Sequence, residues 1–126
     1  MKYQELMKEV EGVGKLKLSE QENFYRDVLN ESSNDLEVVV AATFYLGMAY
    51  YYYEGNFNKA KEIIEPIILQ YQSMPFVREL ISAFNLMGVM LYYDGANVSS
   101  RYYYEKALQI AMEHEDVGHY CYEYNN

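Results

Sequence analysis

The sequence predicts an all-α chain built from helical hairpins, and two observations carry this prediction. Two stretches match each other about forty residues apart: Gly47 to Gly88 spans 41 residues, and Gly55 to Gly95 spans 40. On both sides of the second glycine, apolar residues recur every three or four positions, which is the spacing of one helix face. Each stretch is therefore predicted to form two helices joined by a short turn that contains glycine and asparagine.

The apolar faces can be assigned residue by residue. The first helices carry Val39, Thr43, Leu46 and Tyr50 in one copy and Ile81, Phe84, Met87 and Leu91 in the other. The second helices carry Ala60, Ile64, Ile67 and Ile68, matched by Ser100, Tyr104, Ala107 and Leu108. A weaker third copy lies upstream, where Tyr25, Val28 and Leu29 repeat the spacing of the second helix. The expected helices are 2–11, 19–31, 35–53, 57–72, 75–93 and 98–114, with the start of a seventh near Val117.

Helix boundaries are predicted from capping residues. Ser19 with Glu22, and Asn34 with Glu37, resemble capping boxes. Asn56 and Asn97 are expected to cap the second helices of the two hairpins. The segment 12–18, GVGKLKL, is expected to be a linker, and Pro66 should kink the helix that contains it.

We expect residues 1–126 to form a single helical repeat domain with four parts. These are a divergent N-terminal hairpin (1–34), a repeat (35–73), a second repeat (74–115) and the start of a truncated repeat (116–126). Asn125-Asn126 stands where Asn85-Leu86 stands forty residues earlier, just before an expected apolar-glycine pair. We therefore expect the chain to be the N-terminal piece of a longer protein.

Composition and charge exclude several function classes. Apolar residues make up 51% of the chain and aromatic residues 17%, which excludes a disordered tail. The net charge is −9, and no lysine or arginine follows Lys106. Nucleic acid and anionic membranes are therefore disfavoured as partners, because both need clustered cations. No apolar run is long enough to cross a bilayer, and the lone Cys121 fits a cytoplasmic location.

Both copies resemble the tetratricopeptide repeat. In the first, Leu46, Gly47, Tyr50, Gly55 and Ala60 match the family pattern, and in the second Met87, Gly88, Leu91, Gly95, Tyr104, Ala107 and Leu108 do. The resemblance covers residues 35 to 115 and implies a right-handed superhelical stack of antiparallel hairpins, an α-solenoid. The chain departs from the family in its period near 40, its lack of tryptophan, and Ser100 in place of alanine.

The resemblance also implies which side chains line a concave groove. The matching positions are Phe44, Met48, Tyr51 and Tyr52 in one hairpin and Asn85, Val89, Tyr92 and Tyr93 in the next. Aromatic rings with a hydroxyl group suit peptide recognition, and Asn85 can bond a peptide backbone. We expect Tyr50, Leu91 and Tyr104 to pack between helices, whereas the four groove tyrosines fit either binding or packing. The groove positions hold no lysine or arginine, which disfavours the carboxylate clamp known in the family.

The tyrosine run, Tyr50 to Tyr53, contains one residue more than the second copy does. Leu46 to Gly55 is nine steps, and Met87 to Gly95 is eight. The first helix of the first hairpin should therefore run one residue longer or bulge within this run.

No catalytic or metal site is expected. Gly47 and Gly88 lie in the middle of predicted helices, which indicates close approach of a paired helix rather than a phosphate-binding loop. His114, Glu115, Asp116, His119 and Cys121 are metal-ligand residue types, but their spacing matches no tetrahedral zinc pattern. Cys121 has no basic neighbour to lower the pKa of its thiol. We expect neither a cofactor nor enzymatic activity in this segment.

The sequence therefore predicts a non-catalytic module that binds a peptide or protein, with a neutral or basic partner favoured by the acidic surface. One alternative is the N-terminal sensory segment of a bacterial signalling protein, such as a diguanylate cyclase or a peptide-responsive regulator. Its output domain would follow residue 126. A second alternative is homo-oligomerisation through the C-terminal end, where Tyr120, Tyr122 and Tyr124 would be uncovered.

Overall fold

The computed structural model describes residues 1–114 and is built from helices alone over that range. The helices are α1 (Tyr3–Val13), α2 (Leu18–Glu31), α3 (Leu36–Glu54), α4 (Phe57–Leu69), α5 (Arg78–Tyr93) and α6 (Asn97–Glu113), with a 3₁₀ turn at Tyr71–Ser73. The chain forms two compact units, one from Met1 to Pro75 and one that begins at Phe76. The all-α prediction is confirmed.

Each of the six expected helices up to residue 114 is present, and the differences lie at the ends. Helix α1 continues through Gly12 and Val13, so it takes up the start of the expected linker. Helix α4 ends at Leu69 rather than at residue 72, because the chain tightens into the 3₁₀ turn after Gln70. The expected seventh helix lies outside the described residues.

Three of the four predicted caps are wrong by one or two positions. Asp35, not Asn34, precedes α3, and its carboxylate accepts a hydrogen bond from the Val38 N–H at 3.5 Å. Helix α2 begins after Lys17, whose N–H donates to Glu20, so Ser19 and Glu22 lie inside the helix. Asn97 is the first residue of α6, and Ala96 occupies the cap position.

Asn56 caps α4 as predicted. Its side-chain oxygen accepts a hydrogen bond from the Lys59 N–H at 3.1 Å.

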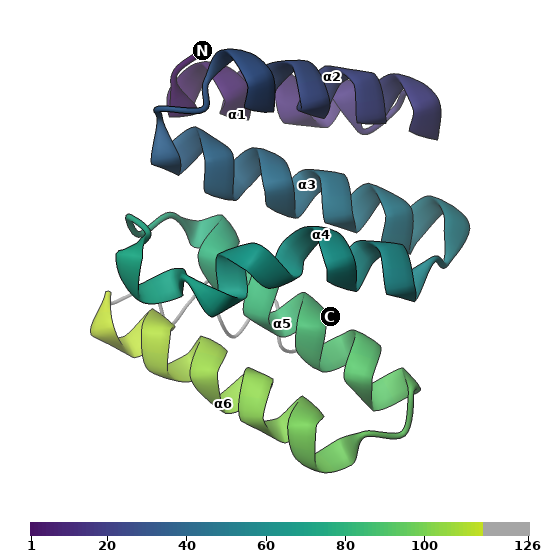
Figure 1. The fold of residues 1–126 in the computed structure, drawn as a ribbon, viewed down its shortest axis with the longest axis vertical. Helices are drawn as coiled ribbons and strands as arrows, with labels where there is room; N and C mark the ends of the chain where they lie inside the picture. Colours follow the sequence, from purple (N-terminus) through teal and green to yellow (C-terminus); the bar gives the residue numbers. More distant parts are fainter. Residues whose placement is uncertain (115–126) are drawn as a thin grey trace. The chain divides into compact units, whose positions relative to one another are not determined.

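In the first unit, α3 lies between α2 and α4, with α1 packed against α2 and α3 (Figure 1). This position explains why α3 is apolar nearly all round, since both flanks are covered. Its buried residues include Val38, Val40, Ala41, Ala42 and Leu46. From α4 the buried face is Ala60, Ile64, Ile67 and Ile68, as the periodicity predicted.

The second unit is organised around the α5–α6 hairpin (Figure 1). All residues of α5 from Glu79 to Gly88 are buried, whereas its last two residues are exposed. Helix α6 buries a narrow face made of Ser100, Ala107, Ile110 and Ala111. The exposed residues of α6 include polar ones such as Arg101 and Glu105, and also Val98 and Met112.

Both mid-helix glycines permit close helix packing. A Cβ at Gly47 would lie 2.5 Å from Ile64 Cγ2, and one at Gly88 would lie 3.1 Å from the Tyr104 ring. In the second hairpin the Ser100 hydroxyl also donates a hydrogen bond of 2.7 Å to the Gly88 carbonyl. The interpretation of these glycines as points of close approach is confirmed.

The surplus residue of the tyrosine run lengthens α3 without a bulge. Helix α3 is continuous through Glu54 and ends at Gly55, whose φ of 62° is left-handed. Helix α5 ends at Tyr93, and Gly95, two residues later, has the left-handed backbone conformation with a φ of 82°. Glycine adopts this backbone conformation without the steric cost that other residues incur.

Candidate functional site

The predicted site residues of the first unit lie along one side of α3 and become more exposed toward its end. Phe44 is buried, and Met48 is half-buried. Tyr51 is half-buried and stacks on Phe57 at the start of α4, with ring centroids 5.3 Å apart. Tyr52 is 72% exposed. In the first unit, therefore, Tyr52 is the site tyrosine most open to a ligand.

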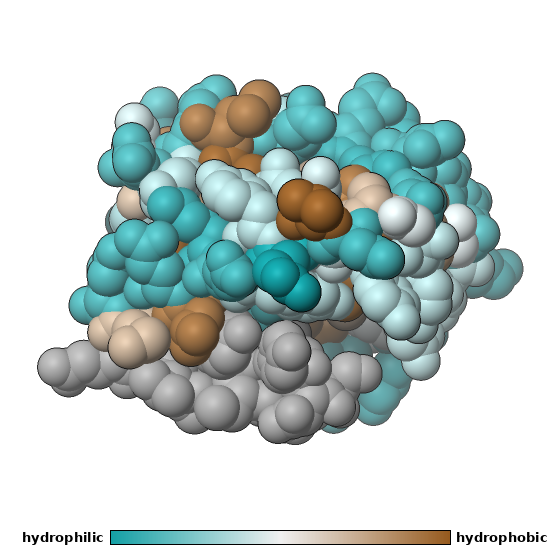
Figure 2. All heavy atoms as spheres, turned by 90° about the horizontal axis from the view of Figure 1, so that it is seen from below, coloured by the Kyte–Doolittle hydropathy of each residue, from teal (hydrophilic) through white to brown (hydrophobic). Residues whose placement is uncertain are grey.

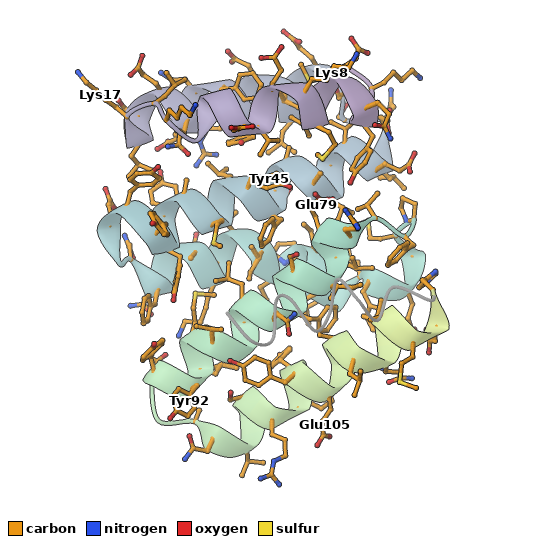
Figure 3. The ribbon with its side chains drawn as sticks, turned by 180° about the vertical axis from the view of Figure 1, so that it is seen from behind. Lys8, Lys17, Tyr45, Glu79, Tyr92 and Glu105 are labelled. Atoms are coloured by element: carbon orange, nitrogen blue, oxygen red, sulfur yellow. The ribbon has the colours of Figure 1, made fainter. Side chains whose placement is uncertain are left out.

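The matching residues of α5 follow the same gradient. Asn85 is buried, Val89 is half-buried, and Tyr92 and Tyr93 are 60% and 67% exposed. The two tyrosine rings meet edge to face with centroids 5.8 Å apart. Tyr92 lies at the end of α5, beside the turn to α6 (Figure 3).

The expected packing residues are less exposed than these tyrosines. Tyr50 is buried, and Leu91 and Tyr104 are half-buried. Of the other residues that match the repeat pattern, Leu46, Ala60, Met87 and Ala107 are buried, and Leu108 is half-buried.

Asn85 is a buried polar residue without a hydrogen bond from its side chain to any of residues 1–114. It is 3% exposed, and within that range neither its side-chain nitrogen nor its side-chain oxygen has a partner. Leaving such a group unsatisfied costs about 1–3 kcal/mol per donor or acceptor. Buried polar side chains are usually hydrogen-bonded, so Asn85 stands out among the described residues at a predicted binding position.

Tyr50 joins three helices of the first unit through polar contacts. Its hydroxyl donates to the Glu22 carboxylate on α2, which also pairs with Arg26 at 3.1 Å. The hydrogen bond from Tyr50, followed by that from Arg26, lowers the pKa of Glu22. On the other side, the Lys59 ammonium lies 5.9 Å from the centre of the Tyr50 ring. These contacts link α2, α3 and α4.

A shallow cavity of about 500 Å³ lies on the α5–α6 hairpin. Its lining comprises Tyr92, Asn97, Ser100, Arg101, Tyr104, Glu105 and Leu108. Arg101 and Glu105 are exposed and form no ion pair within the part of the chain that the structure describes. The cavity therefore offers both signs of charge beside aromatic rings.

A second open cavity, of about 690 Å³, lies in the first unit around the start of α3. Its lining includes Met1 and Lys2 as well as Glu31, Asp35 and Glu37, so its charges are also mixed. Neither cavity holds a cluster of metal ligands: among residues 1–114, no group of three or more histidine, cysteine or acidic side chains is arranged to bind a metal.

The predicted metal-ligand types fall mostly outside the described residues, as does Cys121. His114 is described, and its ring stacks on Phe76 with centroids 4.0 Å apart. The tyrosines proposed for association, at 120, 122 and 124, also lie outside the described residues.

Sequence reasoning missed Arg101 and Asn97 as members of a surface cavity, and it missed the Tyr50–Glu22 bond. Arg101, Tyr104 and Leu108 are spaced as one helix face, so the first omission could have been found from periodicity. The hydrogen bond between Tyr50 and Glu22 could not have been found, because these residues lie on helices whose pairing the sequence does not determine.

No protein-family model matches the chain, and comparisons with curated proteins and with solved structures returned no match. None of the described helices combines the length and apolar character that crossing a bilayer requires.

Proposed function

We propose that this chain is a non-catalytic peptide-binding module of the tetratricopeptide type, in which the ends of α3 and α5 contribute to the binding surface. The observation that carries the proposal is the exposure of large aromatic side chains at the same place on the first helix of both hairpins. Tyr52, Tyr92 and Tyr93 stay exposed although the middle of each helix is buried or half-buried. Tyrosines of this kind are typical binding residues.

The family assignment is supported by the contacts within the two hairpins. Gly47 meets Ile64 and Ala60, and Gly88 meets Tyr104 and Ser100, at matching positions of the repeat pattern. Repeats of this family stack into a right-handed solenoid because each hairpin must cover its neighbour's apolar face. We infer the same stacking here.

Asn85 extends the proposed surface along α5. A peptide carries N–H and C=O groups at regular spacing, and a carboxamide can both donate and accept a hydrogen bond. Neither the nitrogen nor the oxygen of the Asn85 carboxamide has a hydrogen-bond partner among the residues that the structure describes. Because it is buried in the free chain, peptide binding there requires a rearrangement that opens the site.

The test is selection of binders by the purified chain from a random peptide library displayed on phage. Enriched peptides are then titrated by fluorescence anisotropy against the wild type and the Tyr52→Ala/Tyr92→Ala variant. We expect the double variant to bind about tenfold or more weakly, as for loss of aromatic contacts at an interface. Tyr51 is left unchanged because it stacks on Phe57.

Tyr102→Ala is the matched control, because Tyr102 is an exposed tyrosine on α6 that is not among the residues proposed for binding. It should bind like the wild type, and circular dichroism should show equal helicity in all three proteins. Failure to enrich any peptide, or equal binding by the double variant, would contradict the proposal.

A further inference from the structure

The two first helices end in the same short pattern. Helix α3 ends in Tyr52-Tyr53-Glu54 before Gly55, and α5 ends in Tyr92-Tyr93 before Asp94 and Gly95. In each case the two rings meet edge to face, at 5.2 Å and 5.8 Å between centroids, and the acidic residue is exposed. We call these two groups the tyrosine-acid ends.

Each tyrosine-acid end places a carboxylate at the C-terminus of a helix. The C-terminus of a helix carries a partial negative charge, so a carboxylate there is unfavourable and a cation is favourable. No basic residue occupies the last turn of α3 or α5. Glu31 and Glu113 also end helices, so the acid alone is not distinctive in this chain. What distinguishes α3 and α5 is the exposed pair of tyrosines beside the acid.

An exposed tyrosine pair next to a carboxylate is suited to a cation. Ring faces attract ammonium and guanidinium groups, and the carboxylate adds a charge-assisted hydrogen bond. The same tyrosine run already shows the first of these contacts, because the Lys59 ammonium lies over the Tyr50 ring. The chain's net charge of −9 further favours a positively charged partner.

We propose that each tyrosine-acid end binds a lysine or arginine side chain of a basic peptide segment. The proposal rests on the proposed function and specifies the chemistry of its ligand. The faces of the tyrosine rings contact the cation, and Glu54 or Asp94 accepts its hydrogen bonds. Where the face shown in Figure 2 is coloured, its hydrophobic side chains form separated patches rather than one continuous area.

The test uses the full chain and a monovalent probe, so that each tyrosine-acid end is read as a site of its own. Arginine amide is titrated into protein labelled for NMR at the tyrosine rings, and citrulline amide, its neutral analogue, serves as the matched control. We expect arginine amide to shift the ring signals of Tyr52, Tyr53, Tyr92 and Tyr93. Citrulline amide should leave them nearly unchanged.

Tyr102 is the control inside the molecule, because it is 56% exposed but is not followed by an acidic residue at a helix end. Its shift should be smaller than those of the four tyrosines. In the Glu54→Gln variant the shifts at Tyr52 and Tyr53 should be reduced while those at Tyr92 and Tyr93 persist, and Asp94→Asn should do the reverse.

Two outcomes would overturn the proposal: shifts no larger than that of Tyr102, or equal shifts with citrulline amide. Tyr92 also borders the cavity that contains Arg101, so a carboxylate ligand is the competing occupant.

If library-selected peptides bind through Tyr52 and Tyr92 but carry no lysine or arginine, the cation site is wrong and the peptide-binding function stands. If no peptide is enriched but arginine amide still shifts the tyrosine ring signals, the cation sites stand and the peptide-binding function is wrong.

Discussion

Ile64 occupies the space that a side chain at Gly47 would need, since a Cβ built there would lie 2.5 Å from Ile64 Cγ2. We expect Gly47→Ala to destabilise the chain by about 1–3 kcal/mol, because overpacking forces Ile64 or the helix backbone to move. The free energy of unfolding from urea titrations measures this. Gly12→Ala is the control: Gly12 lies in α1, and no described atom approaches its Cβ position within 4 Å. It should stabilise by about 0.5–1 kcal/mol, and equal effects at both sites would contradict the packing argument.

Ser100→Ala should lower the free energy of unfolding by about 1 kcal/mol, because it removes the buried hydrogen bond to the Gly88 carbonyl. Ser99→Ala, at the exposed neighbouring position, should have almost no effect. A loss at Ser99 as large as that at Ser100 would contradict this assignment, because alanine is the better helix former and helix propensity alone predicts no loss at either position.

The Glu22 carboxylate should contribute to stability at neutral pH and lose that contribution in acid. Tyr50 and Arg26 lower the pKa of Glu22 in the folded chain below its ordinary value of 4.5. The contribution is therefore fully present above about pH 4.5 and is lost as the pH falls through the lower folded pKa. Wild type and Glu22→Gln should differ in urea midpoint at pH 7 and converge in acid. Glu65→Gln, at an exposed position on α4, is the control and should follow the wild type.

Tyr25 should limit stability at alkaline pH. Burial raises the pKa of its hydroxyl to about 12, because the anion would lose its hydration. The neutral hydroxyl is therefore compatible with the fold at low and neutral pH. Above the ordinary tyrosine pKa of about 10, stability is lost progressively up to about pH 12, since the unfolded chain deprotonates first. Tyr25→Phe should unfold less readily than the wild type between these pH values, and an unchanged alkaline profile would contradict the assignment.

Asn85→Leu should raise the free energy of unfolding by about 1–3 kcal/mol, because it replaces a buried amide that has no hydrogen-bond partner among residues 1–114 with an apolar group of similar size. The same change should weaken binding of the peptides selected by the wild type. Thermal unfolding and anisotropy on one protein preparation measure both. Greater stability with unchanged binding would make Asn85 a packing defect rather than a binding residue.

The sequence predicted the helices well because their apolar residues repeat with strict helical spacing over long segments. It also predicted the close approach at Gly47 and Gly88, since a glycine in mid-helix is costly unless a neighbouring helix needs the space of its missing side chain. The caps were less predictable, because Asn34 and Asp35 are both good capping residues and only the fold decides between them. The prediction that Asn97 caps α6 was also wrong. The cap lies four residues before the buried Ser100, and that residue is Ala96.

The candidate site was predictable in part. The repeat pattern identified positions on α3 and α5 but not how far each is exposed, which depends on neighbours such as Phe57 beside Tyr51. Tyr53 illustrates the limit. Its hydroxyl donates to the Gly14 carbonyl in the α1–α2 loop, a contact between segments whose pairing no local pattern encodes.

The extra residue of the tyrosine run shows where this chain tolerates insertion. Gly47 meets Ala60 and Gly88 meets Ser100, although the first interval is one residue longer than the second. The additional residue is absorbed entirely between Tyr50 and Asn56, and the helices on either side keep their rotational phase. The end of α3, next to the Gly55 turn, therefore accommodates a change in length. A tag, a fluorophore or a grafted loop placed there should leave the hairpin intact, whereas the same insertion before Tyr50 would rotate one helix out of phase with its partner.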